Sequence, residues 1–224
     1  MFNIFSVGGS LIYPKTGLDY KFIKAFVNFI KEEVKLGNKF ILVTGGGKIA
    51  RDYISLAKKL DLSRDKQDTL GIASTRQNAL LLKLLLKEIA FSQIIEDPIE
   101  KINFKKRLAI AGGFKPGRST DYVSVMLAKT YQADMVVNLS NIDYVYDKDP
   151  KIKGAKKIKN INWADFRAIV GDKWSPGFNS PFDPVAAKLA QKNNIKVVVL
   201  NGKKIDNIKK CLKKENFIGT TISD

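Results

Sequence analysis

The sequence predicts an α/β protein with a mostly parallel sheet. Short apolar, β-rich runs alternate with amphipathic helical patterns along the chain, which is typical of βαβ units. A chain of 224 residues is long enough to bury a sizeable core. No internal repeat or low-complexity linker interrupts it, so a single domain over residues 1–224 is expected.

The elements of the first half follow from hydrophobic periodicity. An apolar run predicts a strand over 2–7. In 20–35 the apolar side chains fall on one helical stripe, and Gly37 is suited to end that helix in a left-handed conformation. The same reasoning gives a strand over 39–43, a helix that starts near Lys48 and a longer helix over 68–89.

The second half continues the alternation. We expect strands over 107–111, 134–139, 196–200 and 217–222, and helices over 120–131, 183–192 and 205–213. The polar, turn-rich stretch 144–158 is a candidate hairpin. The stretch 172–182, rich in glycine, proline and serine, is the most loop-like segment of the chain.

Composition excludes several classes of chemistry. The chain has no histidine, which removes Ser-His-Asp and Cys-His catalysis, histidine bases and histidine-bound zinc. Cys211 is the only cysteine, so no disulfide forms within one chain and a reducing, cytoplasmic location is expected. The N-terminus lacks a charged signal-peptide region, and the most apolar run is short and broken by Lys83, so no membrane partner is expected.

The formal net charge is +17, from 39 Lys and Arg against 22 Asp and Glu. Such a balance attracts anions, including nucleotides and nucleic acid. The lysines are spread over the chain, however, and the local runs 101–107 and 203–214 lack the interleaved aromatic residues of a strand-binding surface. We therefore expect a solvated lysine surface and not nucleic-acid binding.

Three glycine clusters directly follow expected strands. They are Gly8-Gly9-Ser10, Gly45-Gly46-Gly47 and Gly112-Gly113. Glycine lets backbone amides approach a phosphate closely, and a following helix adds its unpaired N–H groups and partial positive charge. One such cluster is often only a turn, but three at equivalent points of an open sheet favour phosphate binding.

Two segments partly match a known phosphate-binding motif, but each lacks residues that the motif requires. The segment from Gly112 to Ser119 resembles a P-loop, yet Arg118 stands where the lysine belongs, and the strand over 134–139 does not end in an aspartate for Mg²⁺. In Gly45-Gly46-Gly47-Lys48 the glycine spacing is wrong. No G-x-G-x-x-G follows a strand, which argues against a nicotinamide enzyme.

The segment NIDYVYDKDP, residues 141–150, has two interpretations. Its Asn, Asp and Pro residues form turns readily, so it is a candidate connection without further role. Alternatively, Tyr146 offers a ring for stacking on a base, while Asn141 and Asp149 offer polar contacts to a nucleoside. The residues alone leave both interpretations open.

In this order the glycine loops and NIDYVYDKDP resemble the amino acid kinase family over the whole chain. Within that family, GGSL, TGGGKIARDYI, DTLGIASTRQNALLL, GGFKPGRSTD, DPVAAKLA and GTTI are similar to UMP kinases of the archaeal type. The resemblance implies a three-layer sandwich with a central, mostly parallel sheet flanked by helices. It also implies transfer of a phosphoryl group from ATP, with Mg²⁺, to UMP. Tyr144 departs from the family's usual glycine.

The resemblance implies site residues position by position. The acceptor would bind in the N-terminal part, about 1–132, and ATP in the C-terminal part, about 133–224. Gly9, Ser10, Gly47 and Arg51 would face the ATP phosphates, and Ser140, Asn141, Tyr146 and Asp149 would line the adenine nucleoside pocket. UMP would contact Gly46, Asp68 through its sugar hydroxyls, and the loop Phe114, Lys115, Pro116, Gly117, Arg118, Ser119 and Thr120, with Arg118 at its phosphate.

One departure concerns catalysis. Many family members carry a lysine in the first strand, where this chain has Ser6 or Val7. Lys48, Arg51 or Lys188 are candidates to replace its charge, and we expect Lys48 to do so. Asp183 matches an acidic family position that orients catalytic lysines or Mg²⁺. No side-chain metal site is expected beyond the Mg²⁺ carried by ATP.

Alternatives remain within and outside the family. Isopentenyl phosphate kinases rely on an active-site histidine, which this chain lacks, and acetylglutamate kinases have acceptors with carboxylates. A nucleotide-binding protein of weak activity is a further alternative. The resemblance also implies a homohexamer built as a trimer of dimers, and the apolar stretch 79–89 suits either an interface or a buried core helix.

Overall fold

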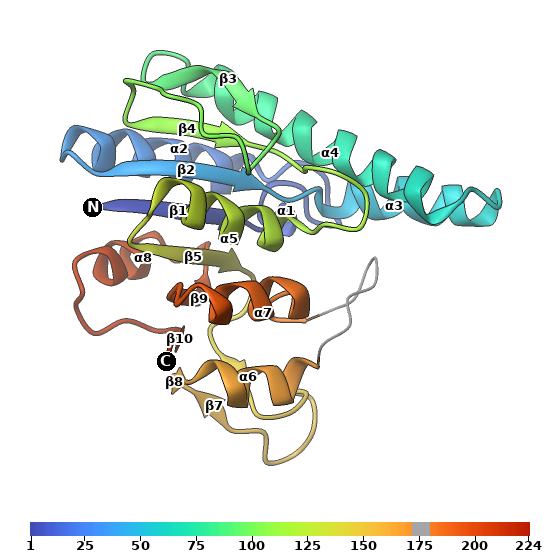
Figure 1. Ribbon diagram of the computed structural model, residues 1–224, viewed down its shortest axis with the longest axis vertical. Helices are drawn as coiled ribbons and strands as arrows, with labels where there is room; N and C mark the ends of the chain where they lie inside the picture. The colour runs from blue at the N-terminus through green and yellow to red at the C-terminus, as the bar shows by residue number, and fades with distance from the viewer. Residues whose placement is uncertain (172–179) are drawn as a thin grey trace.

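A computed structural model of the chain, in which residues 1–171 and 180–224 are described, contains a sheet of eight strands (Figure 1). The strands follow the order β3-β4-β2-β1-β5-β9-β10-β8. All neighbouring pairs are parallel except β9 and β10, which run antiparallel. The predicted mostly parallel sheet is confirmed. Because neighbouring strands are parallel, loops from distant parts of the chain lie together at the carboxyl ends of the strands.

The elements have the following bounds. The strands of this sheet are β1 Phe2–Val7, β2 Lys39–Thr44, β3 Ala90–Ile95, β4 Leu108–Ala111, β5 Met135–Ser140, β8 Asn160–Ile161, β9 Val197–Asn201 and β10 Thr220–Ile222. A separate hairpin consists of β6 Val145–Tyr146 and β7 Lys157–Ile158. The helices are α1 Gly9–Ile12, α2 Tyr20–Lys35, α3 Gly47–Lys59, α4 Arg64–Leu85, α5 Thr120–Tyr131, α6 Trp163–Val170, α7 Pro184–Lys192 and α8 Ile205–Leu212.

Helices cover both faces of the sheet, which makes the three layers that the family resemblance implies (Figure 1). On one face α2, α4 and α8 pack on strand residues such as Phe5 and Phe40. On the other face α5, α6 and α7 pack on strand residues such as Ile4 and Val136. Strands buried on both faces explain why β1, β2, β5 and β9 are almost continuously apolar.

Side-chain caps fix several helix starts. Asp19 accepts a hydrogen bond from Phe22 N at 3.0 Å, and Ser119 accepts one from Tyr122 N at 3.1 Å. A cap of this kind satisfies one of the N–H groups that a helix start leaves unpaired. The predicted bounds of α2 and α5, which follow these caps, are confirmed to the residue.

Other expected elements need correction. The long helix predicted over 68–89 is α4, which begins at Arg64 and ends at Leu85. Residues after α4 form a turn that leads into β3, a strand that the sequence analysis missed. The predicted hairpin within 144–158 is confirmed as β6 and β7, whereas α6 was not expected. Most of the loop-like stretch 172–182 lies outside the described residues.

The hairpin of β6 and β7 is tied to the main sheet through one buried hydroxyl. Thr220 Oγ1 accepts a hydrogen bond from Val145 N at 2.9 Å and donates one to Ile158 O at 2.5 Å. Thr220 is fully buried, so both bonds lie away from water. The segment that contains Tyr146 is therefore attached firmly to β10.

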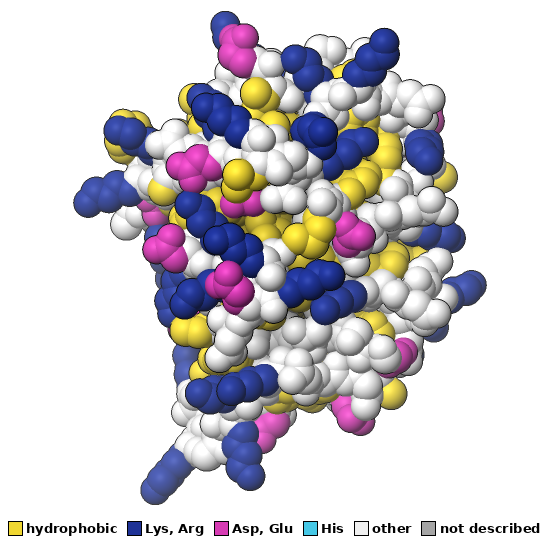
Figure 2. Space-filling view, turned by 90° about the vertical axis from the view of Figure 1, so that its left-hand side faces the viewer, with side chains coloured by type: hydrophobic (Ala, Val, Ile, Leu, Met, Phe, Trp, Pro, Cys, Tyr) yellow, Lys and Arg dark blue, Asp and Glu magenta, His cyan; other side chains and the backbone are white. Residues whose placement is uncertain are grey.

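Charge is distributed over the end of the molecule opposite the glycine loops. Figure 2 shows Lys and Arg side chains across this side, with Asp and Glu side chains between them. This agrees with the expected solvated lysine surface on the face in view. Within residues 1–171 and 180–224, none of the helices combines the length and apolarity that a membrane span requires.

Candidate active site

Two glycine loops touch each other through their backbones at the carboxyl ends of β1 and β2. Gly45 N donates a hydrogen bond to Val7 O at 2.9 Å. A Cβ on Gly9 would lie 2.0 Å from Gly47 N, and one on Gly47 would lie 2.4 Å from Gly9 O. Gly47 also has a φ of +71°, which favours glycine. The backbone of Gly9, Gly45 and Gly47 forms a surface without side chains next to the first turn of α3, and we call this surface the glycine floor.

The loop after β4 is held by helix α4. Thr75 Oγ1 accepts a hydrogen bond from Gly113 N, and Asp68 Oδ2 accepts one from Gly117 N, both at 2.7 Å. Asn78, also on α4, donates to Gly45 O at 2.8 Å. One helix therefore contacts the loops after both β2 and β4. Thr75 and Asn78 were missed by the sequence analysis, because a polar residue in a helix gives no sign of its partner.

The predicted UMP loop lies partly exposed between its two anchors. Residues Lys115 to Arg118 are exposed, and Phe114, Ser119 and Thr120 are half-buried. The guanidinium of Arg118 lies over the Tyr122 ring, 4.7 Å from its centroid. A guanidinium stacked on an aromatic face keeps its N–H edge available for an anion.

The predicted ATP residues on β5 and the hairpin share one cavity. Ser140, Asn141, Tyr146 and Asp149 all line a cavity of about 470 Å³, which suits a nucleoside. Gly8 N donates to Leu139 O at 2.8 Å, so the cavity adjoins the glycine floor. The structure thus brings these four residues together.

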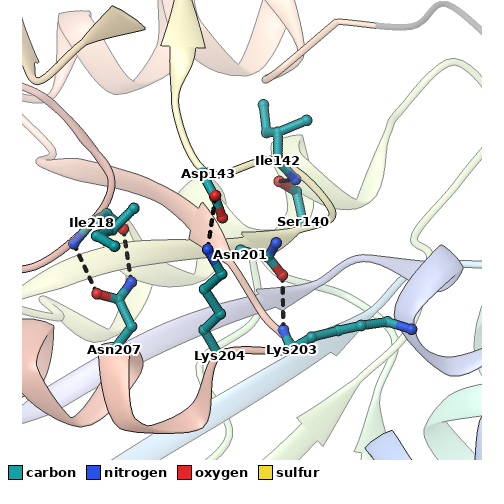
Figure 3. Close-up of polar contacts among 8 residues, drawn as sticks. All are labelled: Ser140, Ile142, Asp143, Asn201, Lys203, Lys204, Asn207 and Ile218. Carbon is teal, nitrogen blue, oxygen red and sulfur yellow. Dashed lines mark hydrogen bonds and ion pairs between the residues drawn. The ribbon is translucent and has the colours of Figure 1, made fainter.

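An ion pair between Lys204 and Asp143 anchors the 141–149 segment (Figure 3). Lys204 Nζ lies 2.7 Å from Asp143 Oδ2 and joins the start of α8 to the 141–149 segment. The Lys204 ammonium holds the pKa of Asp143 below its ordinary value. In the same view Ile142 N donates to Ser140 Oγ and Lys203 N donates to Asn201 Oδ1. These bonds shape the turn that leads into the cavity.

Two carboxylates meet beside the position of the missing first-strand lysine. Ser6 Oγ donates to Asp121 Oδ1 at 3.0 Å, and Asp183 N donates to Asp121 Oδ2 at 3.2 Å. Asp183 is buried, and its Oδ1 accepts the capping bond from Ala186 N at 2.9 Å. Burial and the nearby Asp183 carboxylate raise the pKa of Asp121 to about 6. Asp121 is a further candidate that the sequence analysis missed.

The predicted catalytic lysine has a partner on its own helix. Lys48 follows Gly47 at the start of α3, and its Nζ forms an ion pair with Asp52 Oδ1, one turn along. Its backbone N donates to Tyr13 O at 2.8 Å. Arg51 lies exposed on the same helix, with no side-chain hydrogen bond or ion pair to another described residue.

The order of the strands sets the layout of the site. The loop from Gly112 to Thr120, which is the predicted acceptor loop, follows β4, and the cavity predicted to hold a nucleoside follows β5, with β2 and β1 between them. Three strand spacings separate the two, about 14 Å in total. The touching glycine loops of β1 and β2 occupy the space between. No hydrogen bond among the described residues joins the acceptor loop directly to the nucleoside cavity.

Comparison with known proteins shows which family the chain belongs to. A family model described as "Amino acid kinase family" matches residues 1–201. The chain belongs to the amino acid kinase family. It is 38% identical to a uridylate kinase of Pyrococcus abyssi over 90% of both chains, and 33% identical to one of Hyperthermus butylicus over 93% of this chain and 92% of the relative.

A solved member of the amino acid kinase family has the same fold. The crystal structure of a uridylate kinase from Archaeoglobus fulgidus covers 100% of both chains with a TM-score of 0.85 and 34% identity. A UMP kinase from Bacillus anthracis, at 23% identity and a TM-score of 0.83, supports the fold alone. The fold that the resemblance implied is therefore confirmed.

The Asp121–Asp183 pair leads to a prediction about pH. The folded-state pKa of Asp121 lies above the ordinary value of 3.8, so the folded protein binds this proton at a pH where the unfolded chain does not. Its contribution to the free energy of unfolding is therefore present near pH 4 and is lost as the pH rises through about 6. The size of this change is on the order of 2 kcal/mol.

Chemical denaturation from pH 4 to 8 measures this contribution. The difference between wild type and Asp121→Asn should fall as the pH rises across that range. Ser6→Ala removes the hydroxyl that stabilises the carboxylate and should move the midpoint to higher pH. A carboxyl titration of Asp121 by NMR with a midpoint near the ordinary value would contradict the prediction.

Proposed function

We propose that the protein is a UMP kinase, which transfers the γ-phosphoryl group of ATP to UMP and releases UDP and ADP. One observation carries the proposal: an anion-compatible loop and a nucleoside-sized cavity lie on opposite sides of a floor made of glycine backbone. The names of the relatives and of the Archaeoglobus fulgidus structure support the same acceptor.

On the donor side, we assign the nucleoside of ATP to the cavity. The ring of Tyr146 is available for stacking, and Ser140, Asn141 and Asp149 supply polar groups around it. The phosphates would then extend over Gly9, Ser10 and Gly47 toward Arg51. Backbone N–H groups at the start of α3 favour negative charge there.

On the acceptor side, UMP would bind between α4 and the loop from Phe114 to Thr120. Arg118 suits the UMP phosphate, because among the described residues its guanidinium contacts the Tyr122 ring and makes one long hydrogen bond, to Gly117 O. One carboxylate oxygen of Asp68 accepts a hydrogen bond from Gly117 N, so its other oxygen is available for a sugar hydroxyl. Gly46 would contact the acceptor from the glycine floor. This division keeps the acceptor in 1–132 and ATP mostly in 133–224.

The chemistry requires little covalent participation by the protein. An oxygen of the UMP phosphate is already ionised, so it attacks the γ-phosphorus without a general base while the bond to the β,γ-bridging oxygen breaks. The protein's tasks are to align the two phosphates and to neutralise charge. This explains how a chain without histidine performs the reaction.

Mg²⁺ fits the carboxylates at this site. Asp121 and Asp183 are hard oxygen donors beside the glycine floor, and magnesium in kinases is commonly bound by one or two carboxylates together with substrate phosphates. We assign the ion to the nucleotide, so that Mg²⁺ would arrive with ATP and the two carboxylates would meet it in the complex. When bound, Mg²⁺ neutralises phosphate charge.

Activity on a panel of acceptors tests the proposed function. A coupled assay that detects ADP should show turnover with MgATP and UMP, and far less with CMP or acetylglutamate. Activity on acetylglutamate or isopentenyl phosphate but not UMP would reassign the acceptor. ATP binding without turnover on any acceptor would favour a nucleotide-binding protein and overturn the proposal.

Lys48 is our candidate for the cation that replaces the first-strand lysine. To reach the phosphates, Nζ must exchange Asp52 for the nucleotide, and the pair is half-exposed, so it costs little to break. Lys48→Met should lower kcat by about a hundredfold, the usual effect of removing one stabilising donor. Lys58→Met, an exposed lysine farther along α3, is the matched control. Unchanged kcat in Lys48→Met with a large loss in Arg51→Met would transfer the role to Arg51.

We also propose a homo-oligomer, for which the resemblance implies a trimer of dimers. Exposed apolar side chains gather on the α3–α4 pair, which supports an interface there: Tyr53, Leu56, Leu60, Leu80 and Leu84. Light scattering should give a mass above that of one 25.0 kDa chain. Leu56→Lys should lower this mass, whereas Leu36→Lys, exposed after α2, should not. A monomeric wild type would contradict the proposal.

A further inference from the structure

Arg76 is an arginine in the middle of α4 whose side chain reaches the backbone of the acceptor loop. Its Nε donates to Gly113 O at 3.2 Å and its Nη2 donates to Phe114 O at 3.3 Å. Its Nη1 forms an ion pair with Glu96 Oε2 at 2.7 Å. All three nitrogens of the guanidinium therefore bind protein oxygens. The side chain is about one-third exposed, so these bonds are partly shielded from water.

Packing adds to these bonds. A Cβ on Gly112 would lie 2.8 Å from Cγ and 3.3 Å from Cα of Arg76. The loop backbone thus rests directly on the stem of the arginine. The glycine at 112 is needed for this contact with α4, whatever its role toward a phosphate. Arg76 supports the loop both by contact and by hydrogen bonding.

Arg76 and Arg118 therefore have different surroundings. The guanidinium of Arg118 stacks on Tyr122 and has a long contact of 3.4 Å with Gly117 O. That of Arg76 is committed to two loop carbonyls and to Glu96, the residue that follows β3. Arg118 can bind an anionic substrate, whereas each nitrogen of the Arg76 guanidinium already donates one bond to a protein oxygen.

We propose that Arg76, held by Glu96, is a positioning residue that fixes the acceptor loop before the acceptor binds. The proposal rests on the proposed function, because it assigns the loop at 112–118 to UMP. Asp68 fixes the far end of the loop through Gly117 N, and Arg76 fixes the near end. A loop fixed at both ends needs no ordering when the acceptor binds.

The planar fork of arginine is essential to this role. Two adjacent carbonyls and one carboxylate lie around a single guanidinium, and each nitrogen points to one of them. An ammonium group is a point charge and does not reproduce this geometry. Glu96 orients the fork, since it is the charged partner of Arg76 on the side of β3.

Steady-state kinetics tests the proposal. Arg76→Met should raise the KM for UMP by about tenfold, because a displaced loop misaligns the acceptor, with the KM for ATP within about twofold of wild type. Arg76→Lys should recover little, and Glu96→Gln should show a smaller effect in the same direction. Lys83→Met is the matched control, since Lys83 also links α4 to β3, through a 3.1 Å bond to Ser92 O, without touching the loop.

Amide hydrogen exchange without substrate provides a second, independent measurement. Exchange across 113–117 should be faster in Arg76→Met and unchanged in Lys83→Met. Unchanged exchange, or equal increases in both KM values, would overturn the proposal. If wild type does not phosphorylate UMP, the proposed function fails, and the exchange measurement still decides whether Arg76 anchors the loop.

Discussion

The contact between the backbones of Gly9 and Gly47 is the constraint on which the site depends. A single methyl group at either position would collide with the other loop. The contact exists because β1 and β2 are parallel neighbours in register up to Val7 and Thr44, so both loops leave the sheet at the same level. What remains above them is glycine backbone without side chains. Under the proposed function, such a surface would accept a chain of phosphates.

Helix α4 converts this local contact into a complete site. Its buried polar residues Thr75 and Asn78 have their partners in the loops after β4 and β2, and Thr44 Oγ1 donates to Thr75 O at 2.8 Å. Leaving such buried groups unpaired would cost about 1–3 kcal/mol each. Loop positions and helix position therefore stabilise one another. This explains why α4 is polar on a side that faces the protein interior, and why its periodicity is a poor guide to its ends.

The sequence predicts the layers, most strands and the glycine loops, because these depend on neighbours along the chain. Helices α2 and α5 were predicted to the residue from their periodicity, and the structure shows that Asp19 and Ser119 cap their starts. Strand β3 was missed, because it is an edge strand with exposed residues and lacks a continuous apolar run. Asp121 and Arg76 escaped notice because their partners, Asp183 and Glu96, lie far along the chain. The family resemblance supplied the remaining site residues, which stay predictions.

Ser6 connects the missing lysine to the acidity of the site. A lysine in the first strand would lie beside Asp121 and offset the charge of the Asp121–Asp183 pair. A serine hydroxyl donates only one hydrogen bond, so repulsion and burial leave the pKa of Asp121 near 6. The site therefore carries two neighbouring carboxylates close to the glycine loops, without a first-strand lysine to offset their charge. Under the proposed function, ATP binds favourably there only if cations offset this negative charge. The Mg²⁺ carried by the nucleotide and Lys48 on α3 would together supply that positive charge.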